Sequence, residues 1–204
     1  MVDIGVLSYG VGNVQSILHM LDALRVPSIR VEKPEQVAQC RRLILPGVGA
    51  FDEGMQKLRA GGWEDILKLA VLEEGKPLLG LCLGMQMLLE NSEEGTQSGL
   101  GFIRGRVKAL KGRAPQGLPL PHMGWNYVFK EKESPLIANL DENARFYFAH
   151  SFYAEPEESV TILSVEYGFR FTCGVQKDCI FGVQFHPERS HRFGMHLLKN
   201  FSVL

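Results

Sequence analysis

The sequence lacks the signals of several protein classes. None of its cysteines belongs to a C-x-x-C pair, which argues against zinc-ribbon and thioredoxin-type sites. No apolar run reaches the roughly 18 residues of a membrane-spanning helix, and the first residues lack the basic region and cleavage site of a secretory signal. We therefore expect reduced thiols and a cytoplasmic protein. The four cysteines are Cys40, Cys82, Cys173 and Cys179.

An excess of charge of one sign is also missing. The 204 residues include 22 Lys and Arg against 23 Asp and Glu, for a net charge of −1, whereas nucleic-acid-binding proteins are usually clearly basic. Hydrophobic residues make up 45% of the chain, which is ordinary for a globular protein that needs no disulfide or metal to stabilise its core. We expect one domain over residues 1–204 that binds neither nucleic acid nor a membrane.

Strands and helices are expected to alternate over the first 90 residues. Short apolar runs indicate buried strands, and apolar residues at 3.6-residue spacing indicate helices. Such alternation is typical of a parallel sheet covered by helices on both faces. The strands are expected at 4–9, 27–31, 43–45 and 77–81, and the helices from 14 to 24, from 51 to 74 with a break at Gly61-Gly62, and from 85 to 90.

The second half has a different pattern, with short, turn-rich and often alternating segments. Residues 164–171 predict a hairpin with its turn near Gly168, and the chain ends in an amphipathic helix expected over 190–201. The fold class that follows is a single three-layer α/β domain with a mostly parallel central sheet flanked by helices and additional antiparallel strands in the second half. Further strands are expected at 145–149, 160–165 and 180–183.

Cys82 stands on an expected sharp turn between a strand and a helix. The run Gly80-Leu81-Cys82-Leu83-Gly84 has the form of a nucleophile elbow with Cys in place of Ser. The flanking glycines permit strained backbone angles and close packing. The N–H groups at the start of the following helix favour a thiolate and can stabilise an oxyanion. The alternative is that Cys82 is a small buried core residue.

His186 and Glu188 supply the other parts that such a nucleophile needs. A thiolate nucleophile requires a base, and the base requires a group that orients it. In an extended segment, residues two apart point to the same side, so Glu188 can hold the His186 ring and stabilise its protonated form. By itself an H-x-E pair is more often a solvated or structural pair, but the Cys82 elbow strengthens the catalytic interpretation.

No nucleotide-binding motif is complete. Gly10-Val11-Gly12 and Gly47-Val48-Gly49 follow expected strands, but Gln15 and Asp52 stand where G-x-G-x-x-G requires its last glycine. We expect no cofactor and no metal. The Gly47–Gly49 loop is either a simple turn or a source of N–H groups for a substrate oxygen, since open α/β sheets bind ligands at the carboxyl ends of their strands.

The remaining candidate residues have weaker patterns. A basic cluster either meets a phosphate or an acidic partner or forms a solvated loop, which is the commoner outcome; its members are Arg104, Arg106, Lys108, Lys111 and Arg113. Surface or packing roles on helices are expected for His19, His191 and His196, and structural roles for Cys40, Cys173 and Cys179. His122 and His150 lie in irregular or strand-end segments, and their roles stay open.

The motifs together resemble the class I (triad) glutamine amidotransferases. Three segments carry the resemblance: Pro46–Gly49, Gly80–Gln86 and Phe185–Glu188. Five further segments are similar to the branch formed by glutaminase subunits of imidazole glycerol phosphate synthases, which serve histidine biosynthesis. They are Ser8–Asn13, Pro46–Phe51, His122–Asn126, Phe146–Ser151 and the tail from Ser190 to Phe201.

The resemblance implies an activity and a set of site residues. Cys82 would attack the side-chain amide of L-glutamine and form a glutamyl thioester, His186 would act as base and acid, and Glu188 would orient it. Oxyanion donors would come from the Gly47–Gly49 loop and from the N–H of Leu83. The residues expected to bind substrate or oxyanion are Gly47, Val48, Gly49, Leu83, Gln86, His150, Ser151 and Phe152.

The resemblance also implies a partner, a (β/α)₈ cyclase subunit that forms a heterodimer with this chain and receives ammonia through a channel. The partner-facing positions are Asn13, Trp125, Tyr147 and Arg189. Arg189 departs from the family, which usually has Lys after H-P-E, and the planar guanidinium is not equivalent to an ammonium. Three alternatives stay open: a glutaminase that serves a different synthase, a stand-alone γ-glutamyl hydrolase, and a non-catalytic binding subunit.

Overall fold

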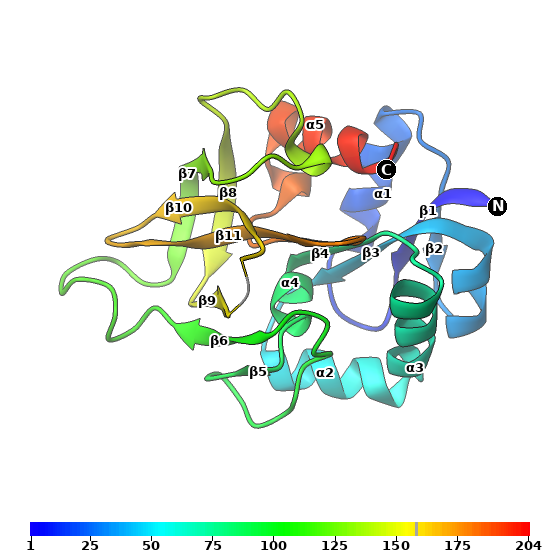
Figure 1. The fold of residues 1–204 in the computed structure, drawn as a ribbon, viewed down its shortest axis with the longest axis horizontal. Helices are drawn as coiled ribbons and strands as arrows, with labels where there is room; N and C mark the ends of the chain where they lie inside the picture. Colours follow the sequence, from blue (N-terminus) through cyan, green and yellow to red (C-terminus); the bar gives the residue numbers. More distant parts are fainter. Residues whose placement is uncertain (158) are drawn as a thin grey trace.

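One twisted sheet runs through the computed structural model, which describes residues 1–157 and 159–204. Its main path follows the order β2-β1-β3-β4-β12-β11-β10-β7-β8. In Figure 1 the parallel strands lie toward the two termini and the antiparallel strands toward the opposite side of the molecule. The expected parallel sheet with additional antiparallel strands from the second half is therefore confirmed, and one late strand, β12, joins the parallel part.

The parallel part consists of strands whose carboxyl ends meet at one edge. Its members are β1 (Val2–Leu7), β2 (Ser28–Val31), β3 (Cys40–Gly47), β4 (Leu78–Cys82) and β12 (Ile180–Val183). β12 lies next to β4 although about 100 residues separate them in the chain. This neighbourhood brings the end of β4 and the segment after β12 to the same edge of the sheet.

The antiparallel part extends the sheet from β12 outward. Its path runs through β11 (Arg170–Lys177), β10 (Thr161–Glu166), β7 (His122–Lys130) and β8 (Arg145–His150). A small side branch joins β11 through β9 (Phe152–Pro156), β6 (Gly105–Ala109) and β5 (Asn91–Ser92). The expected hairpin is confirmed, with Gly168 in its turn at a positive φ of 76°.

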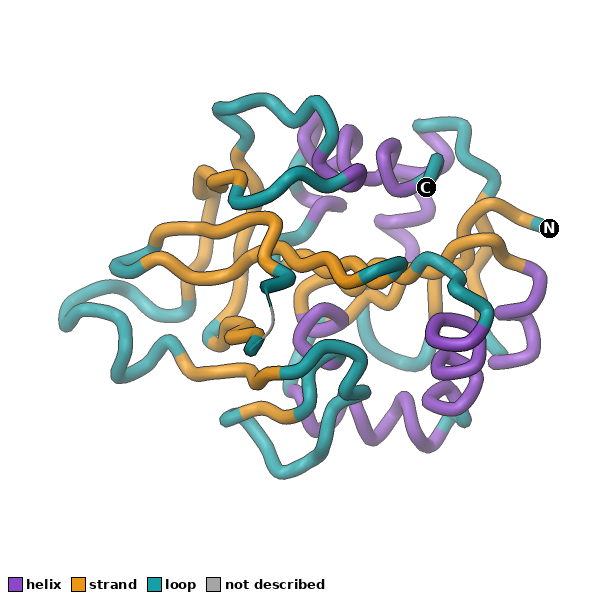
Figure 2. The backbone as a smooth tube through the Cα atoms, viewed as in Figure 1, coloured by secondary structure: helices purple, strands orange, loops and turns teal. Residues whose placement is uncertain are grey.

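Helices cover both faces of the parallel strands (Figure 2). α1 (Val14–Ala23) and α5 (His191–Phe201) lie on one face, and α2 (Phe51–Ala60) and α3 (Trp63–Leu67) on the other (Figure 1). The shorter helices are η1 (Pro34–Gln39), the π-helical η2 (Lys68–Glu73), α4 (Leu83–Met87), η3 (Pro135–Ile137) and η4 (Pro187–Arg189).

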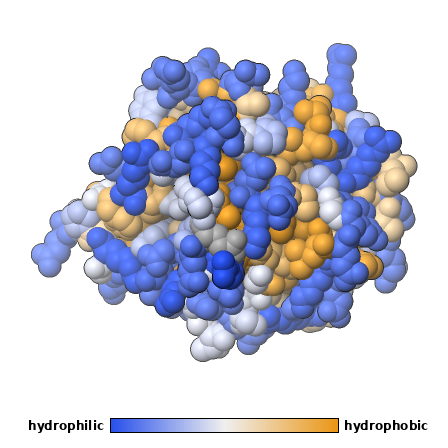
Figure 3. Space-filling model, in the orientation of Figure 1, coloured by the Kyte–Doolittle hydropathy of each residue, from blue (hydrophilic) through white to orange (hydrophobic). Residues whose placement is uncertain are grey.

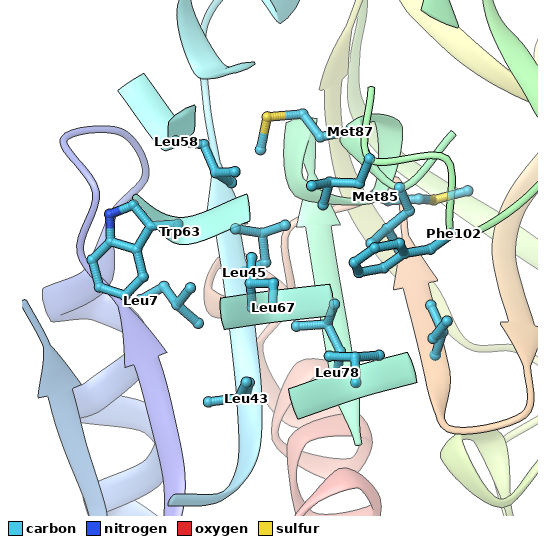
Figure 4. Packing of buried hydrophobic residues seen from close by; sticks show 14 of the residues in the cluster. Leu7, Leu43, Leu45, Leu58, Trp63, Leu67, Leu78, Met85, Met87 and Phe102 are labelled. Atoms are coloured by element: carbon cyan, nitrogen blue, oxygen red, sulfur yellow. The ribbon is translucent and has the colours of Figure 1, made fainter. Parts of the chain in front are cut away.

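The buried strands divide their side chains between two cores. Leu43 and Leu45 face the core below α2 and α3, where Trp63 packs (Figure 4), while Ile44 faces the core below α1 and α5. This alternation follows from the two-residue period of a strand. Because both faces are buried, the strands are apolar throughout, as the sequence pattern predicted.

Several boundaries differ from those predicted from the sequence. The strand expected at 43–45 extends over Cys40–Gly47, because β1 and β4 pair with its two ends. The helix expected over 85–90 ends at Met87, since the N–H of Glu90 donates to the Gly105 carbonyl of β6. The nine residues of β7 were not recognised as a strand.

Among the described residues, no helix is both long enough and apolar enough to cross a membrane. Figure 3 shows one face covered largely by hydrophilic side chains, with apolar surface in patches between them. The exposed large apolar side chains include four from alternate positions of β7, namely Met123, Trp125, Tyr127 and Phe129. One side of β7 therefore presents an apolar stripe to solvent.

Candidate active site

Cys82 occupies a strained turn at the end of β4. Its φ of 52° and ψ of −107° lie in a region that side chains other than glycine rarely adopt. A Cβ on Gly84 would overlap the Leu45 carbonyl oxygen, and a Cβ on Gly80 would come within 2.7 Å of the Gly84 oxygen. The two glycines are thus required for the close packing of α4 on β3 and β4 that holds Cys82 in place.

His186 and Glu188 lie beside Cys82 because β12 neighbours β4. His186 Nδ1 donates to Glu188 Oε1 at 2.8 Å, and both side chains are more than nine-tenths buried. Burial acts to lower the pKa of His186, but hydrogen bonds and charges from Cys82 and Glu188 outweigh it and raise that pKa to about 10. The arrangement therefore favours a protonated imidazole between the Cys82 sulfur and the Glu188 carboxylate.

Ser190 fixes the turn that presents His186. Its hydroxyl donates to the His186 carbonyl at 2.6 Å and accepts from the Tyr147 N–H at 3.0 Å. The His186 N–H in turn donates to the Tyr147 carbonyl at 2.9 Å. The base is thereby tied to β8, and its position depends on strands from both halves of the sheet.

A cavity of about 380 Å³ opens over the Cys82 side chain. Gly47 does not line it: Gly47 lies opposite Cys82 in the sheet register, and a Cβ there would meet Leu83 and the N–H of Gly84. The cavity is large enough for an amino acid such as glutamine. All the other residues expected to bind substrate or oxyanion do line it, namely Val48, Gly49, Leu83, Gln86, His150, Ser151 and Phe152.

The loop above the sulfur is held from both ends. The Tyr9 hydroxyl donates to the Pro46 carbonyl at 2.6 Å, and burial, followed by the charge of Cys82, raises the pKa of Tyr9 far above its usual range. Glu94 accepts from the Phe51 N–H at 2.9 Å. Between these anchors Val48 is 45% exposed and Gly49 has a φ of 99°, a backbone conformation that glycine adopts without strain.

Three polar residues at this site were missed by the sequence reasoning. Tyr9 and Glu94 act on the loop through contacts that span 37 and 43 residues of the chain. Gln184 is fully buried, and its Nε2 lies 3.6 Å from the Cys82 sulfur. Its signal was present as a polar residue inside the apolar run that precedes His186.

Three of the four residues expected to face a partner gather beside the cavity. The Arg189 guanidinium lies 4.3 Å from the centre of the Tyr147 ring, and the Trp125 ring lies 6.2 Å from Tyr147. Trp125 also stacks on His191 at 5.3 Å. Asn13 stands apart at the start of α1, where its side chain accepts from the Ser16 N–H and caps the helix.

The basic cluster lies partly on a strand and partly in the turns beside it, so the expectation of a solvated loop is wrong for its strand residues only. Arg106 and Lys108 lie on β6. Lys108 pairs with Glu155 at 2.8 Å, and Arg113 pairs with Glu93 at 2.9 Å. These carboxylates neutralise part of the cluster. Within residues 1–157 and 159–204, no three His, Cys, Asp or Glu side chains converge as metal ligands.

Comparison with known proteins places the geometry in context. The model of the family described as glutamine amidotransferase class-I matches residues 6–204. The imidazole glycerol phosphate synthase subunit HisH 2 of Methanococcus maripaludis is 48% identical over 199 residues, which cover 97% of this chain and 98% of the relative. HisH 2 of Pseudomonas aeruginosa is 46% identical, with 98% of each chain covered.

Solved structures match the fold at low sequence identity. A crystal structure of a glutamine amidotransferase superposes with a TM-score of 0.75 at 19% identity and covers 98% of this chain and 99% of its own. The glutaminase domain of CTPS from Trypanosoma brucei, solved with bound acivicin, gives 0.66 at 15% identity, with 100% and 94% covered. At these identities the likeness concerns the fold alone, and it agrees with the mixed α/β sheet described above.

Proposed function

Because this chain belongs to the class I glutamine amidotransferase family, we propose that it hydrolyses L-glutamine to glutamate and ammonia at Cys82. Its relatives over nearly the whole length are HisH subunits, so it acts as the glutaminase subunit of an imidazole glycerol phosphate synthase and delivers ammonia to a cyclase subunit. The observation that carries the proposal is the strained Cys82 turn beside the buried His186–Glu188 pair.

The first half-reaction transfers the glutamyl group to sulfur. The Cys82 thiolate attacks the carbonyl carbon of the glutamine side chain, and a C–S bond forms while the carbonyl becomes an oxyanion. The oxyanion then collapses and the C–N bond breaks. His186 gives its proton to the departing nitrogen, which leaves as ammonia, and Glu188 stabilises the imidazolium before this transfer.

The second half-reaction releases glutamate. Neutral His186 takes a proton from a water molecule, and the resulting hydroxide attacks the thioester carbon. The C–S bond breaks, and Cys82 returns to the thiolate. In both halves the Leu83 N–H and N–H groups of the Gly47–Gly49 loop donate to the oxyanion. The elbow orients the Leu83 N–H, and the loop supplies the other half of this oxyanion site.

The cyclase is proposed to dock over the face that carries Trp125, Tyr147 and Arg189. Ammonia released into water becomes protonated and loses its nucleophilicity, so a protein that covers the cavity gives a physical advantage. Arg189 both lines the cavity and stacks on Tyr147. In this arrangement the (β/α)₈ cyclase forms a heterodimer with this chain, and ammonia passes between them by Arg189.

A glutamine analogue with an electrophilic diazoketone in place of the side-chain amide tests the nucleophile. We expect the analogue to attach to Cys82 alone among the four cysteines, with glutamine protecting against it, as measured by peptide mass spectrometry. The Glu188→Gln variant should be labelled more slowly. Labelling that is absent from Cys82, or unaffected by glutamine, would remove the basis of the proposal.

A further inference from the structure

Gln184 is the fully buried residue whose amide contacts the Cys82 sulfur. We propose that Gln184 is a further catalytic residue, a fixed neutral donor that stabilises the Cys82 thiolate. Its amide is oriented through Gln86 by the Phe152 carbonyl, which also accepts from a directed chain of hydrogen bonds beginning at Asn126. This inference rests on the proposed function, since it takes Cys82 as the nucleophile. Nothing in the triad of thiolate, base and carboxylate requires it.

The direction of the Gln184 amide follows from a backbone carbonyl. Gln86 Nε2 lies 3.0 Å from the Phe152 carbonyl oxygen, which can only accept, so this atom is the donating nitrogen. The same nitrogen lies 3.0 Å from the Gln184 side chain, which must therefore present its oxygen to Gln86. The Gln184 NH₂ group is left to face the sulfur at 3.6 Å.

The chain continues from the Phe152 carbonyl in the other direction. His150 Nδ1 lies 2.7 Å from the same oxygen and must donate to it, so His150 Nε2 accepts. His122 Nδ1 then donates to that nitrogen at 3.0 Å, and His122 Nε2 accepts from the Asn126 amide at 3.4 Å. The Asn126 nitrogen also donates to the Glu166 carbonyl at 2.9 Å, which fixes its orientation independently.

Burial agrees with this directed arrangement of two neutral rings. Burial lowers the pKa of His122 to about 4, and burial followed by the charge of His122 lowers the pKa of His150 to about 3. Both rings are thus neutral at physiological pH, each with its proton on Nδ1. Asn126 and the four side chains between it and Cys82 therefore each have one defined hydrogen-bond direction, which agrees with the Glu166 and Phe152 carbonyl oxygens as acceptors.

A neutral amide donor complements His186 at the sulfur. His186 loses its proton to the departing ammonia, so it cannot serve as a charged donor throughout the reaction. The Gln184 amide keeps its protons and stabilises the thiolate both before attack and when the thioester breaks. The titratable groups that face the sulfur are His186 and Tyr9, and neither is replaced in the test below.

The pH profile of Cys82 alkylation tests the proposal without glutamine turnover. Gln184→Met keeps the length of the side chain and removes the donor. We expect iodoacetamide to alkylate Cys82 about tenfold more slowly at pH 7, the loss of one charge-assisted hydrogen bond, and the midpoint of the profile to move to higher pH. Gln56→Met, on the exposed face of α2, is the matched control and should follow the unaltered protein.

A folded Gln184→Met protein with an unchanged alkylation profile would overturn the proposal, whatever its glutaminase activity. If that variant does not fold, nitrogen NMR of the unaltered protein with labelled histidine decides. We expect His122 and His150 to appear as neutral rings protonated on Nδ1 from pH 6 to pH 8. A ring protonated on Nε2, or a charged ring, would contradict the directed chain from Asn126 to the Phe152 carbonyl, which is part of the proposal.

Discussion

At the scale of single residues, the negative charge of Glu188 stabilises the protonated form of His186 and so supports its role as acid and base. One carboxylate oxygen accepts from His186, and the other is buried without a hydrogen-bond partner among the described residues. The carboxylate therefore contributes mainly its negative charge to the imidazolium. This use of a buried charge has a cost in desolvation that the His186 proton offsets.

Replacing Glu188 with Gln removes this charge and keeps the shape. We expect kcat for glutaminase activity to fall by about 10²–10⁴-fold, because the imidazolium loses its stabilising charge. Steady-state assays with the partner present measure the loss. Glu155→Gln, which breaks only the exposed pair with Lys108, serves as the control. Activity of the Glu188→Gln variant near that of the control would contradict the role given to Glu188.

The buried histidine pair gives the protein a dependence on pH. The pKa of His122 is lowered to about 4 and that of His150 to about 3, compared with about 6.5 in an unfolded chain. Below pH 6.5 the unfolded chain binds more protons than the folded one. Stability is therefore fully present above pH 6.5 and decreases as the pH falls toward 4.

Urea denaturation at several pH values measures this decrease. In His122→Asn, the slope of unfolding free energy against pH between 6 and 4.5 should be smaller by up to about 1.4 kcal/mol per pH unit, the contribution of one proton. His19→Asn, on the exposed side of α1, should keep the original slope. Equal slopes for all three proteins would show that His122 is not held neutral by the fold.

The site residues predicted from the sequence belong to short motifs, whereas those it missed act through contacts between distant parts of the chain. Cys82, His186 and Glu188 stand in short motifs whose spacing carries the chemistry. Tyr9 and Gln184 act through contacts between strands that are distant in the chain, over 37 residues for Tyr9 and 102 for Gln184. Such contacts exist only once the strand order is known.

At the scale of the elements, α4 packs against β3 at a distance that admits no side chain. A Cβ on Gly84 would overlap the Leu45 carbonyl oxygen. Gly84→Ala is therefore expected to lose about 3 kcal/mol of stability, because the backbone of α4 must move, and to lose glutaminase activity as Cys82 shifts. Thermal and urea denaturation measure the first effect, and an assay of the folded fraction measures the second.

Gly75→Ala is the control for this substitution. Gly75 has a φ of 69°, and no atom lies within 4 Å of its would-be Cβ. The change should cost about 1 kcal/mol from backbone strain alone and leave activity unaltered. If Gly84→Ala were no more harmful than Gly75→Ala, the close packing of α4 would not be what holds the elbow.

The elements predicted well are those whose burial follows a simple period. The parallel strands and the amphipathic helices α1, α2 and α5 appear where their patterns placed them. The sequence did not predict β7, because this strand turns polar side chains inward and apolar side chains toward solvent. Its inward positions include His122 and Asn126, which belong to the hydrogen-bond chain, while Trp125 and its apolar neighbours face solvent. Under the proposed function both faces of β7 carry functional residues, which explains why the usual arrangement of apolar residues inside and polar residues outside is absent.

At the scale of the whole molecule, the apolar stripe of β7 and the stacked Arg189–Tyr147 pair form one continuous candidate docking face. Exposed aromatic residues and arginines are the groups that contribute most to protein interfaces. In the proposed complex, the antiparallel half of the sheet adds a surface next to the cavity at which the partner can cover the site.

Truncation of Arg189 tests this face. Arg189→Ala should weaken binding of the cyclase by about tenfold or more, and Arg189→Lys should weaken it less, because the charge remains while the planar stacking on Tyr147 is lost. Calorimetric titration measures both. Arg41→Ala, at the start of β3 and 60% exposed, should bind as the unaltered chain does; unchanged affinity in Arg189→Ala would place the partner elsewhere.

The central claim is that the chain is a glutaminase whose activity at Cys82 depends on a cyclase partner. The direct measurement is glutamate release from glutamine by the purified chain, alone and with a cyclase partner and its nucleotide ligand, with Cys82→Ala as the control. The account predicts little release by the chain alone, an increase of at least about tenfold with the partner, and none in the variant. Equal rates with and without the partner, or release that survives in Cys82→Ala, would contradict it.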